Sequence, residues 1–253
     1  MELAPNWQNQ AYYFPTIGST NQEARLRLQI RPREMLLTTD KQTAGRGRLA
    51  RTWEAPFGTG LLSSLTLPLE PLPLEQAYLY TASLGLAVQE AVWQLTQTRL
   101  DLKWPNDLLR EGRKCGGILA ELEANWLILG FGLNISLTET DLLQAGLSDK
   151  ATNIVPDDIE REQLLARILE IFSTYRERLQ IEPLVIWQMW AANLITLGQH
   201  VQVVTVAGQN EFEGQAIKVD QSGRLWVQDM LSQELRAVQA GDVSIRLSNG
   251  RYA

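Results

Sequence analysis

The sequence contains very few of the side chains on which metal centres and nucleophilic catalysis most often depend. Its 253 residues include one cysteine, Cys115, and one histidine, His200. A single cysteine excludes an intramolecular disulfide framework and an all-cysteine metal site. A single histidine excludes every multi-histidine metal centre, and a Ser-His-Asp hydrolase would have to use His200 as its base.

The sequence also has no excess of basic residues, and it has no long apolar run. Lysine and arginine together number 23 against 29 acidic residues, for a net charge of -6. This balance argues against a general nucleic-acid binder, which needs a basic surface to release counterions. No window of about 20 apolar residues could span a bilayer, and residues 1–18 do not have the pattern of a signal peptide. We therefore expect a cytoplasmic protein with neither a membrane nor a nucleic-acid partner.

Residue patterns predict an α+β region followed by a small all-β region. Thr20 and Glu23 have the spacing of a capping box. The expected helices cover residues 20–30, 74–95 and 157–180, and the expected strands of the first region cover residues 35–39, 61–67, 100–104, 116–122 and 125–129. The short strands that follow Gly198 suggest a small barrel. We place the domain boundary between residues 1–195 and residues 196–253.

The most distinctive segment is a basic, glycine-containing loop at residues 41–51. It carries four cations and no acid in eleven residues, and these cations are Lys41, Arg46, Arg48 and Arg51. An anion-binding loop needs forked donors and peptide N–H groups that can turn inward. The loop is not a P-loop, because the pattern G-x-x-x-x-G-K-[ST] is absent. A solvated basic surface loop is the alternative.

A second segment places a lysine next to glycines and a turn. Lys-Trp-Pro-Asn-Asp at residues 103–107 is followed by Gly-Arg-Lys-Cys-Gly-Gly-Ile-Leu at residues 112–119. In a partly enclosed site, Lys114 could serve as a fixed cation between two anions. Asp107 could orient this lysine or hold a metal ion. The alternative is a plain hairpin, with Asn-Asp forming one turn and Gly-Arg-Lys the other.

Two further segments combine a structural with a functional interpretation. Ser-Thr-Asn at residues 19–21 suits a helix cap, but polar groups at a helix N-terminus can also hold a polar ligand atom. Gly-Phe-Gly-Leu-Asn at residues 130–134 follows an expected strand. Its glycines let a flat molecule lie against the backbone, and a β-bulge is the alternative.

Together and in this order, these segments resemble those of biotin–protein ligases, from about Ser19 to Leu247. The second segment contains two motifs, so the four segments hold five motifs. Each motif alone is weak, but five in order are specific. The resemblance implies a class II synthetase-like mixed sheet with helices, the biotin/lipoate ligase fold, as a catalytic domain at residues 1–195. It also implies a small SH3-like β-barrel at residues 196–253.

The resemblance further implies an ATP-dependent ligase, with Mg²⁺ accompanying ATP, that activates biotin as biotinyl-5′-AMP. Biotin is then transferred to one lysine of the biotin carboxyl carrier domain of acetyl-CoA carboxylase or a related carboxylase. The implied catalytic residues are Lys114, Arg46 and Arg48. The implied biotin-binding residues are Ser19, Thr20, Asn21, Gln42, Gly45, Trp53, Lys114, Gly117, Leu119 and Gly130. The implied ATP or adenylate contacts are Arg46, Arg48, Arg51, Asn106, Asp107, Lys114 and Asn134, with Asp107 as a possible metal ligand.

Some alternatives stay open at this point. A lipoate or octanoate–protein ligase, and a non-catalytic biotin-binding module, use a similar fold. The chain could be a monomer or a homodimer. Only 18 residues precede Ser19, too few for the helix-turn-helix domain of some bacterial relatives, so we expect a ligase without repressor function. Ala50 stands where many relatives carry glycine, and Phe131 is bulkier than the usual occupant.

Overall fold

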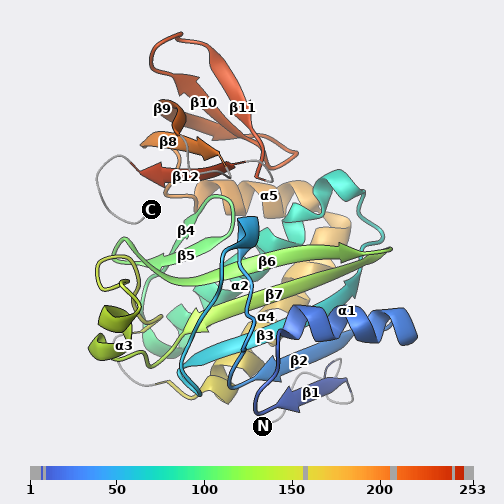
Figure 1. Cartoon of the computed structure of the whole chain (residues 1–253). Helices are drawn as coiled ribbons and strands as arrows, with labels where there is room; N and C mark the ends of the chain where they lie inside the picture. The colour runs from blue at the N-terminus through green and yellow to red at the C-terminus, as the bar shows by residue number, and fades with distance from the viewer. Residues whose placement is uncertain (1–6, 8–9, 156–158, 206–209, 241–242, 248–253) are drawn as a thin grey trace.

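The computed structural model describes residues 7, 10–155, 159–205, 210–240 and 243–247 (Figure 1). The first part of the chain forms a seven-stranded sheet in the order β1-β2-β3-β7-β6-β5-β4. The strands are β1 (Ala11–Phe14), β2 (Met35–Thr39), β3 (Gly60–Pro68), β4 (Asp101–Lys103), β5 (Asp107–Arg110), β6 (Arg113–Glu123) and β7 (Trp126–Asn134). Only the β1–β2 pair is parallel among these pairings, so the sheet is mixed, as predicted.

Helices cover both faces of this sheet (Figure 1). One face packs against α1 (Thr20–Ile30), and the opposite face is covered by α2 (Tyr78–Thr96) and α4 (Arg161–Ile181). The helix α5 (Pro183–Ala192) packs on α2 and α4, and α3 (Glu139–Gln144) is short. Alternate residues of a strand point to opposite faces. In β7, Leu129, Phe131 and Leu133 therefore join the large core under α2 and α4, whereas Ile128 joins the small core under α1.

The start of α1 differs from the prediction. Ser19, not Thr20, is the N-cap, and its hydroxyl oxygen accepts a hydrogen bond from the Gln22 N–H at 3.5 Å. Glu23 binds the Arg27 guanidinium at 2.7 Å instead of closing a capping box. The expected Thr20–Glu23 capping box is therefore wrong. The physical reason is that Thr20 already lies inside the helix, where its side chain contacts other segments of the chain.

Most of the expected elements of the first region are confirmed, but β1, α3 and the ten-residue helix α5 were not among them. Residues 35–39 and 61–67 form strands as predicted. The four-residue strand β5 was not predicted, and residues 130–134 continue β7 instead of forming a bulge. The helix expected to begin at residue 157 begins at Arg161, and residues 156–158 lie outside the described part of the chain.

The C-terminal part forms a second, antiparallel sheet in the order β11-β10-β9-β8-β12. Its strands are β8 (His200–Thr205), β9 (Asn210–Val219), β10 (Leu225–Asp229), β11 (Leu235–Val238) and β12 (Val243–Leu247). The short strands expected after Gly198 are therefore confirmed. This C-terminal sheet lies against α5 (Figure 1), and Val201 and Val227 share one buried core with Trp190 of α5. A domain boundary at residue 195 stays a prediction.

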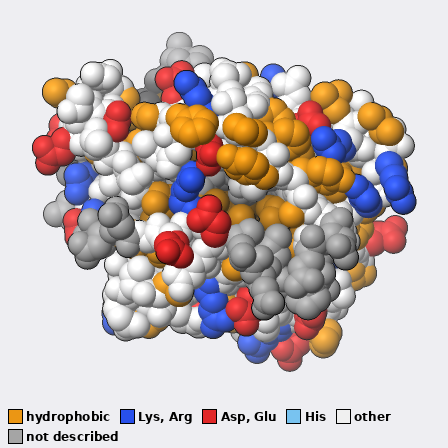
Figure 2. Space-filling model, turned by 90° about the horizontal axis from the view of Figure 1, so that it is seen from below, with side chains coloured by type: hydrophobic (Ala, Val, Ile, Leu, Met, Phe, Trp, Pro, Cys, Tyr) orange, Lys and Arg blue, Asp and Glu red, His pale blue; other side chains and the backbone are white. Residues whose placement is uncertain are grey.

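Figure 2 looks at the molecule from the side of β1, the edge strand of the first sheet. Hydrophobic side chains lie here between those of lysine and arginine. Tyr13 is 60% exposed and Ile30 is 85% exposed. The Arg27 guanidinium lies 4.2 Å from the centre of the Tyr12 ring. Part of this aromatic surface is therefore covered by a cation.

None of the helices in the described part of the chain has both the length and the apolar character needed to cross a membrane.

Candidate active site

Glycines leave part of the backbone of β6 and β7 without side chains of its own, on the face of the sheet that packs against α1. Gly117 of β6 pairs with Gly132 of β7, and Leu119 pairs with Gly130. A Cβ atom on Gly130 would lie 2.1 Å from Asn21 Oδ1, and one on Gly132 would lie 2.6 Å from Trp53 Cε2. These glycines are required because α1 and the basic loop approach the sheet so closely. Phe131 points to the opposite face and is 4% exposed, so its bulk does not enter this surface.

Four neutral side chains meet where α1 begins, and we call them the polar cluster: Thr20, Asn21, Gln42 and Ser64. The Ser64 hydroxyl lies 2.7 Å from Thr20 Oγ1 and 2.6 Å from Asn21 Oδ1. Gln42 Oε1 accepts a hydrogen bond from the Thr20 backbone N–H at 2.8 Å. Thr20, Asn21 and Ser64 are each at most 5% exposed. Helix, loop and strand are therefore joined by one buried hydrogen-bond network.

The partners of this cluster fix the orientation of its two amides. Asn21 Nδ2 donates to Glu121 Oε2 at 2.7 Å, so Asn21 Oδ1 faces the Ser64 hydroxyl. Glu121 is in turn held by an ion pair with Arg25 at 3.1 Å. The side-chain oxygen of Gln42 accepts from the Thr20 N–H, so Gln42 Nε2 lies on the side of Gly45. A Cβ atom on Gly45 would lie 3.1 Å from this nitrogen. The Gln42 amide therefore offers N–H donors on this side.

A second group of side chains lies on the same face, where β4, β5 and β6 meet. We call it the cationic cluster: Lys103, Lys114 and Arg48 around Asp107. Lys114 Nζ lies 2.5 Å from Asp107 Oδ1. Lys103 is the residue opposite Asp107 in the antiparallel pairing of β4 with β5. Burial alone would raise the pKa of the Asp107 carboxyl, but Lys114, Lys103 and Arg48 hold that pKa below its ordinary value. One carboxylate among three cations leaves an excess of positive charge suited to an anion.

Arg48 is attached to the turn between β4 and β5 by Asn106. The Arg48 guanidinium donates to Asn106 Oδ1 at 3.0 Å, and Asn106 Nδ2 donates to the Ile118 carbonyl at 2.6 Å. Burial lowers the pKa of Arg48, as does nearby Arg51, whereas Asp107 opposes this shift. A guanidinium keeps its proton in proteins. Arg48 is therefore a partly buried permanent charge in a fixed position.

The basic loop folds back on itself over the sheet. Trp53 N donates to the Gly45 carbonyl at 3.0 Å, and Gly47 N donates to the Arg51 carbonyl at 2.7 Å. A Cβ on Gly45 would lie 2.3 Å from the Trp53 carbonyl oxygen, so this close crossing requires glycine. The Trp53 ring covers Gly132, and its centre lies 5.5 Å from Lys114 Nζ. Trp53 thus forms an aromatic wall beside the cationic cluster.

The structure brings together most, but not all, of the residues expected from the sequence. Arg46 and Arg51 lie on the loop with exposed side chains. Ser19 uses its hydroxyl to cap α1. Asn134 ends β7, and its side-chain amide donates to the Thr152 carbonyl at 3.1 Å. The Thr152 N–H in turn donates to the Lys114 carbonyl. These four residues border the two clusters and belong to neither.

Comparisons with known proteins agree with this arrangement. Residues 13–133 match the Biotin/lipoate A/B protein ligase family. The chain is 31% identical over 219 residues to the biotin–[acetyl-CoA-carboxylase] ligase of Mycobacterium tuberculosis, covering 83% of this chain and 78% of that protein. The chain belongs to the biotin/lipoate A/B protein ligase family.

Two further relatives cover nearly the whole chain. The bifunctional ligase/repressor BirA of Bacillus subtilis is 29% identical over 243 residues, covering 92% of this chain and 73% of that protein. The structure of the biotin protein ligase from Aquifex aeolicus in complex with biotin and ATP superimposes with a TM-score of 0.77 at 26% identity. It covers 94% of this chain and 99% of that one. The similarity therefore extends over both sheets of this family member.

Three residues of this ligase-family site were missed in the sequence: Ser64, Glu121 and Lys103. Lys103 lies in the Lys-Trp-Pro-Asn-Asp segment and therefore had a local signal. Ser64 had none, because it lies in a strand that is buried on both faces and also contains Ser63 and Thr66. Glu121 had none, because its partners Asn21 and Arg25 are about a hundred residues away along the chain. Lys103 is 5% exposed. A buried lysine is normally paired, and Asp107 lies opposite Lys103 across β4 and β5.

Two other features limit the chemistry of this site. In the described part of the chain, no group of three or more His, Cys, Asp or Glu side chains could hold a metal ion. Cys115, next to Lys114, is 0% exposed, and its thiol lies 3.4 Å from the Leu108 carbonyl. Burial raises the pKa of Cys115 to about 12. A thiol with such a pKa is not a nucleophile at neutral pH.

Proposed function

We propose that this chain is an ATP-dependent biotin–protein ligase. It joins biotin to AMP with release of pyrophosphate, and then transfers biotin to one lysine of the biotin carrier domain of a carboxylase such as acetyl-CoA carboxylase. Its relatives in Mycobacterium tuberculosis and Aquifex aeolicus are named as ligases of this kind. The arrangement of the two clusters supports the same reaction.

One observation carries this proposal: the polar cluster and the cationic cluster lie on one glycine-surfaced face of β6 and β7. Gly130 contacts Asn21 of the polar cluster, and Gly132 lies two residues further along the strand, opposite Gly117. Gly117 in turn lies against the Lys114 side chain, whose Nζ would be 3.3 Å from a Cβ at this position. Two residues of a strand span about 7 Å. An elongated molecule with a neutral polar head and an anionic tail fits this layout.

Biotin has these two ends. Its ureido group, with one carbonyl and two N–H groups, is assigned to the polar cluster, where Gln42 Nε2 offers donors and the hydroxyl oxygens of Thr20 and Ser64 offer acceptors. Leu119 and Trp53 supply apolar surface beside Gly130 and Gly132 for the fused rings and the aliphatic chain. The biotin carboxylate then reaches Lys114.

The cationic cluster suits the first chemical step. A carboxylate oxygen of biotin attacks the α-phosphorus of ATP, a P–O bond forms, and the bond to pyrophosphate breaks. Both reactants are anions, so they approach only where fixed positive charge offsets their repulsion. Lys114 is placed to contact both the carboxylate and the α-phosphate. Arg48 lies beside it, and Arg46 and Arg51 of the loop are assigned to the remaining phosphates.

In the second step, the ε-amine of the carrier lysine attacks the acyl carbon of biotinyl-5′-AMP. An amide bond forms, AMP leaves with the bonding electrons, and the amine loses its proton. The loop at residues 41–53 covers the glycine surface through Trp53 and therefore limits the access of water to the anhydride. Asn134, at the end of β7, is assigned to the nucleotide side.

Magnesium would arrive with ATP. Mg²⁺ is usually held by one or two carboxylates together with phosphate oxygens and water. The lowered pKa keeps Asp107 ionised, so this site offers one carboxylate near the phosphates, which fits that mode of binding. When bound, the metal would offset phosphate charge.

Intact-mass spectrometry of a purified carboxylase carrier domain tests the proposed function. The carrier is incubated with this protein, magnesium, ATP and either biotin or lipoate. We expect the mass of biotin on one lysine, and its loss in Lys114→Ala. Lys150→Ala is a matched control, because Lys150 is exposed and only its backbone carbonyl contacts Lys114. Addition of lipoate alone would identify a lipoate ligase, and binding of biotin without transfer would identify a non-catalytic binding protein.

A further inference from the structure

The β9–β10 turn of the C-terminal sheet, residues 220–224, is held rigid by one of its own side chains. Asp220 Oδ1 accepts hydrogen bonds from the backbone N–H groups of Ser222 and Arg224 at 3.0 and 3.1 Å. Its Oδ2 accepts from Trp226 Nε1 at 2.8 Å and from the Arg224 guanidinium at 2.9 Å. The backbone carbonyls of this turn are therefore presented in a fixed arrangement.

Three aromatic side chains from the first part of the chain donate to these carbonyls. The Tyr78 hydroxyl donates to Gln221 O at 3.1 Å, Trp104 Nε1 to Gly223 O at 2.9 Å, and Trp187 Nε1 to Asp220 O at 3.0 Å. Gly223 adopts a φ of +75° and sits on the Tyr78 ring, where a Cβ would lie 2.8 Å from Cγ. The turn is thus hydrogen-bonded to α2, to α5 and to the segment between β4 and β5.

Trp104 differs from Tyr78 and Trp187 because it belongs to the segment that enters the active site. It lies between Lys103, which ends β4, and Asn106, which binds Arg48. Trp104 is 1% exposed, and its backbone N–H donates to the hydroxyl of fully buried Thr196 at 3.0 Å. Both its side chain and its backbone are therefore held by residues that come after α5 in the chain.

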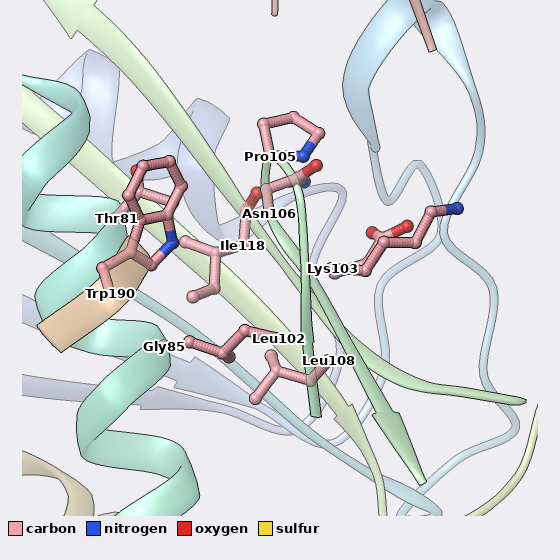
Figure 3. Close-up of a pocket in the computed structure, with 10 residues that line it drawn as sticks. Thr81, Gly85, Leu102, Lys103, Pro105, Asn106, Leu108, Ile118 and Trp190 are labelled. Atoms are coloured by element: carbon pink, nitrogen blue, oxygen red, sulfur yellow. The ribbon is translucent and has the colours of Figure 1, made fainter. Parts of the chain in front are cut away.

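The turn that follows Trp104 borders a small cavity. This cavity of about 10 Å³ lies between the turn and the helices, lined by Thr81 and Gly85 of α2, Trp190 of α5, and Pro105 and Asn106 (Figure 3). In Figure 3 the Lys103 side chain extends away from this cavity. The hydrogen bonds of Trp104 connect this turn to Thr196 and Gly223, which follow α5 in the chain.

We propose that Trp104 is a positioning residue, through which the β9–β10 turn holds Asn106 and Asp107 in the active site. This inference rests on the proposed ligase function and gives the C-terminal sheet a part in the first chemical step. A displacement of reacting groups by about 1 Å can cost roughly 100-fold in rate. The polar cluster lies on other elements, so biotin binding should be spared.

The test is the kinetics of biotin-dependent exchange of labelled pyrophosphate into ATP, for the full chain and its variants. In Trp104→Phe, which removes the donor and keeps an aromatic ring, we expect kcat to fall by about tenfold or more, with the KM for biotin within about twofold. Thr196→Val removes the acceptor for the Trp104 N–H at nearly constant volume and should lower kcat in the same way. This second variant keeps the test decisive if Trp104→Phe does not fold.

Trp187→Phe is the matched control, because it removes an equivalent hydrogen bond to the same turn from α5. It should lose thermal stability as Trp104→Phe does and keep the wild-type kcat. Wild-type kcat in either Trp104→Phe or Thr196→Val would overturn the inference, as would an equal fall of kcat in Trp187→Phe. No exchange in the wild-type protein would contradict the proposed ligase function itself, which separates the two failures.

Discussion

The polar cluster and the cationic cluster lie on the same face of one sheet but hold their side chains by different means. The polar cluster is a network of neutral hydrogen bonds in which Ser64 joins Thr20 and Asn21. The cationic cluster depends on charge, with Asp107 placed among Lys103, Lys114 and Arg48. Neutral hydrogen bonds are short-ranged and directional, whereas charge acts over longer distances. We therefore expect the first cluster to determine which molecule binds and the second to determine how fast it reacts.

The largest effect should come from removing the central cation. Lys114→Met keeps most of the side-chain length but loses the charge that faces the carboxylate and the α-phosphate. We expect the rate of pyrophosphate release to fall by about 10²–10³, with a smaller fall in biotin affinity from the lost contact with the carboxylate. Stopped-flow measurement of pyrophosphate and calorimetric titration with biotin would separate the two quantities. If biotin affinity fell as much as the rate, the division of labour between the clusters would be wrong.

A smaller effect should follow when the glycine surface is filled beside the polar cluster. In Gly130→Ala the new Cβ would lie 2.1 Å from Asn21 Oδ1, so the Asn21 amide must move. We expect the KM for biotin to rise by about tenfold or more, equivalent to at least about 1.4 kcal/mol. Gly18→Ala is the control, because a Cβ at Gly18 meets nothing within 4 Å. Equal KM values in the two variants would show that the position of Asn21 does not matter for biotin.

Loss of one hydroxyl should have a moderate effect. Ser64→Ala removes a hydrogen bond worth about 1 kcal/mol, so we expect the KM for biotin to rise by about fivefold. Its neighbour Ser63 donates to Thr38 Oγ1 at 3.0 Å, outside the polar cluster. Ser63→Ala should therefore lose similar stability without a change in KM. A change in KM that is the same in both variants would count against a role for Ser64 in orienting the cluster.

The smallest effect concerns the dependence of stability on pH. Because the folded-state pKa of Asp107 lies below its ordinary value of 3.8, its ionised form stabilises the fold above that pH. This stabilisation is lost as the pH falls through the lowered pKa. We expect the difference in free energy of unfolding between the wild type and Asp107→Asn to shrink between pH 7 and pH values below 3.8. Urea unfolding at several pH values measures this difference, and the loss in Ser64→Ala should stay constant over the same range.

The sequence analysis named three of the four residues of each cluster, and it missed Lys103 in the cationic cluster and Ser64 in the polar cluster. Arg48, Asp107 and Lys114 lie in segments whose charge and glycine spacing have a local meaning, so their chemistry could be inferred. Ser64 lies in β3, a strand that is buried on both faces. Such a strand shows no alternation of polar and apolar residues, and the partner of Ser64 is 43 residues away along the chain. Its role could be seen only once the chain had folded.

The fold, too, could be predicted from the sequence only where the signal is local. Elements with five or more residues and clear end signals, such as α1 and β2, were predicted to within a residue or two. The strand β5 has only four residues and follows a turn, so its pattern was too short to separate from a loop. The contacts of the β9–β10 turn with Trp104 join residues 119 positions apart. Local propensity holds no information about such a pairing.

The buried position of Cys115 makes the chain suitable for labelling at a single chosen site. The only cysteine of the sequence is 0% exposed, and its raised pKa keeps it protonated. Thiol reagents should therefore leave the native protein unmodified. A cysteine introduced at exposed Glu54, next to Trp53, would be the one reactive group. A fluorophore attached there would report whether the basic loop moves when nucleotide and biotin bind, in a protein that needs no other change.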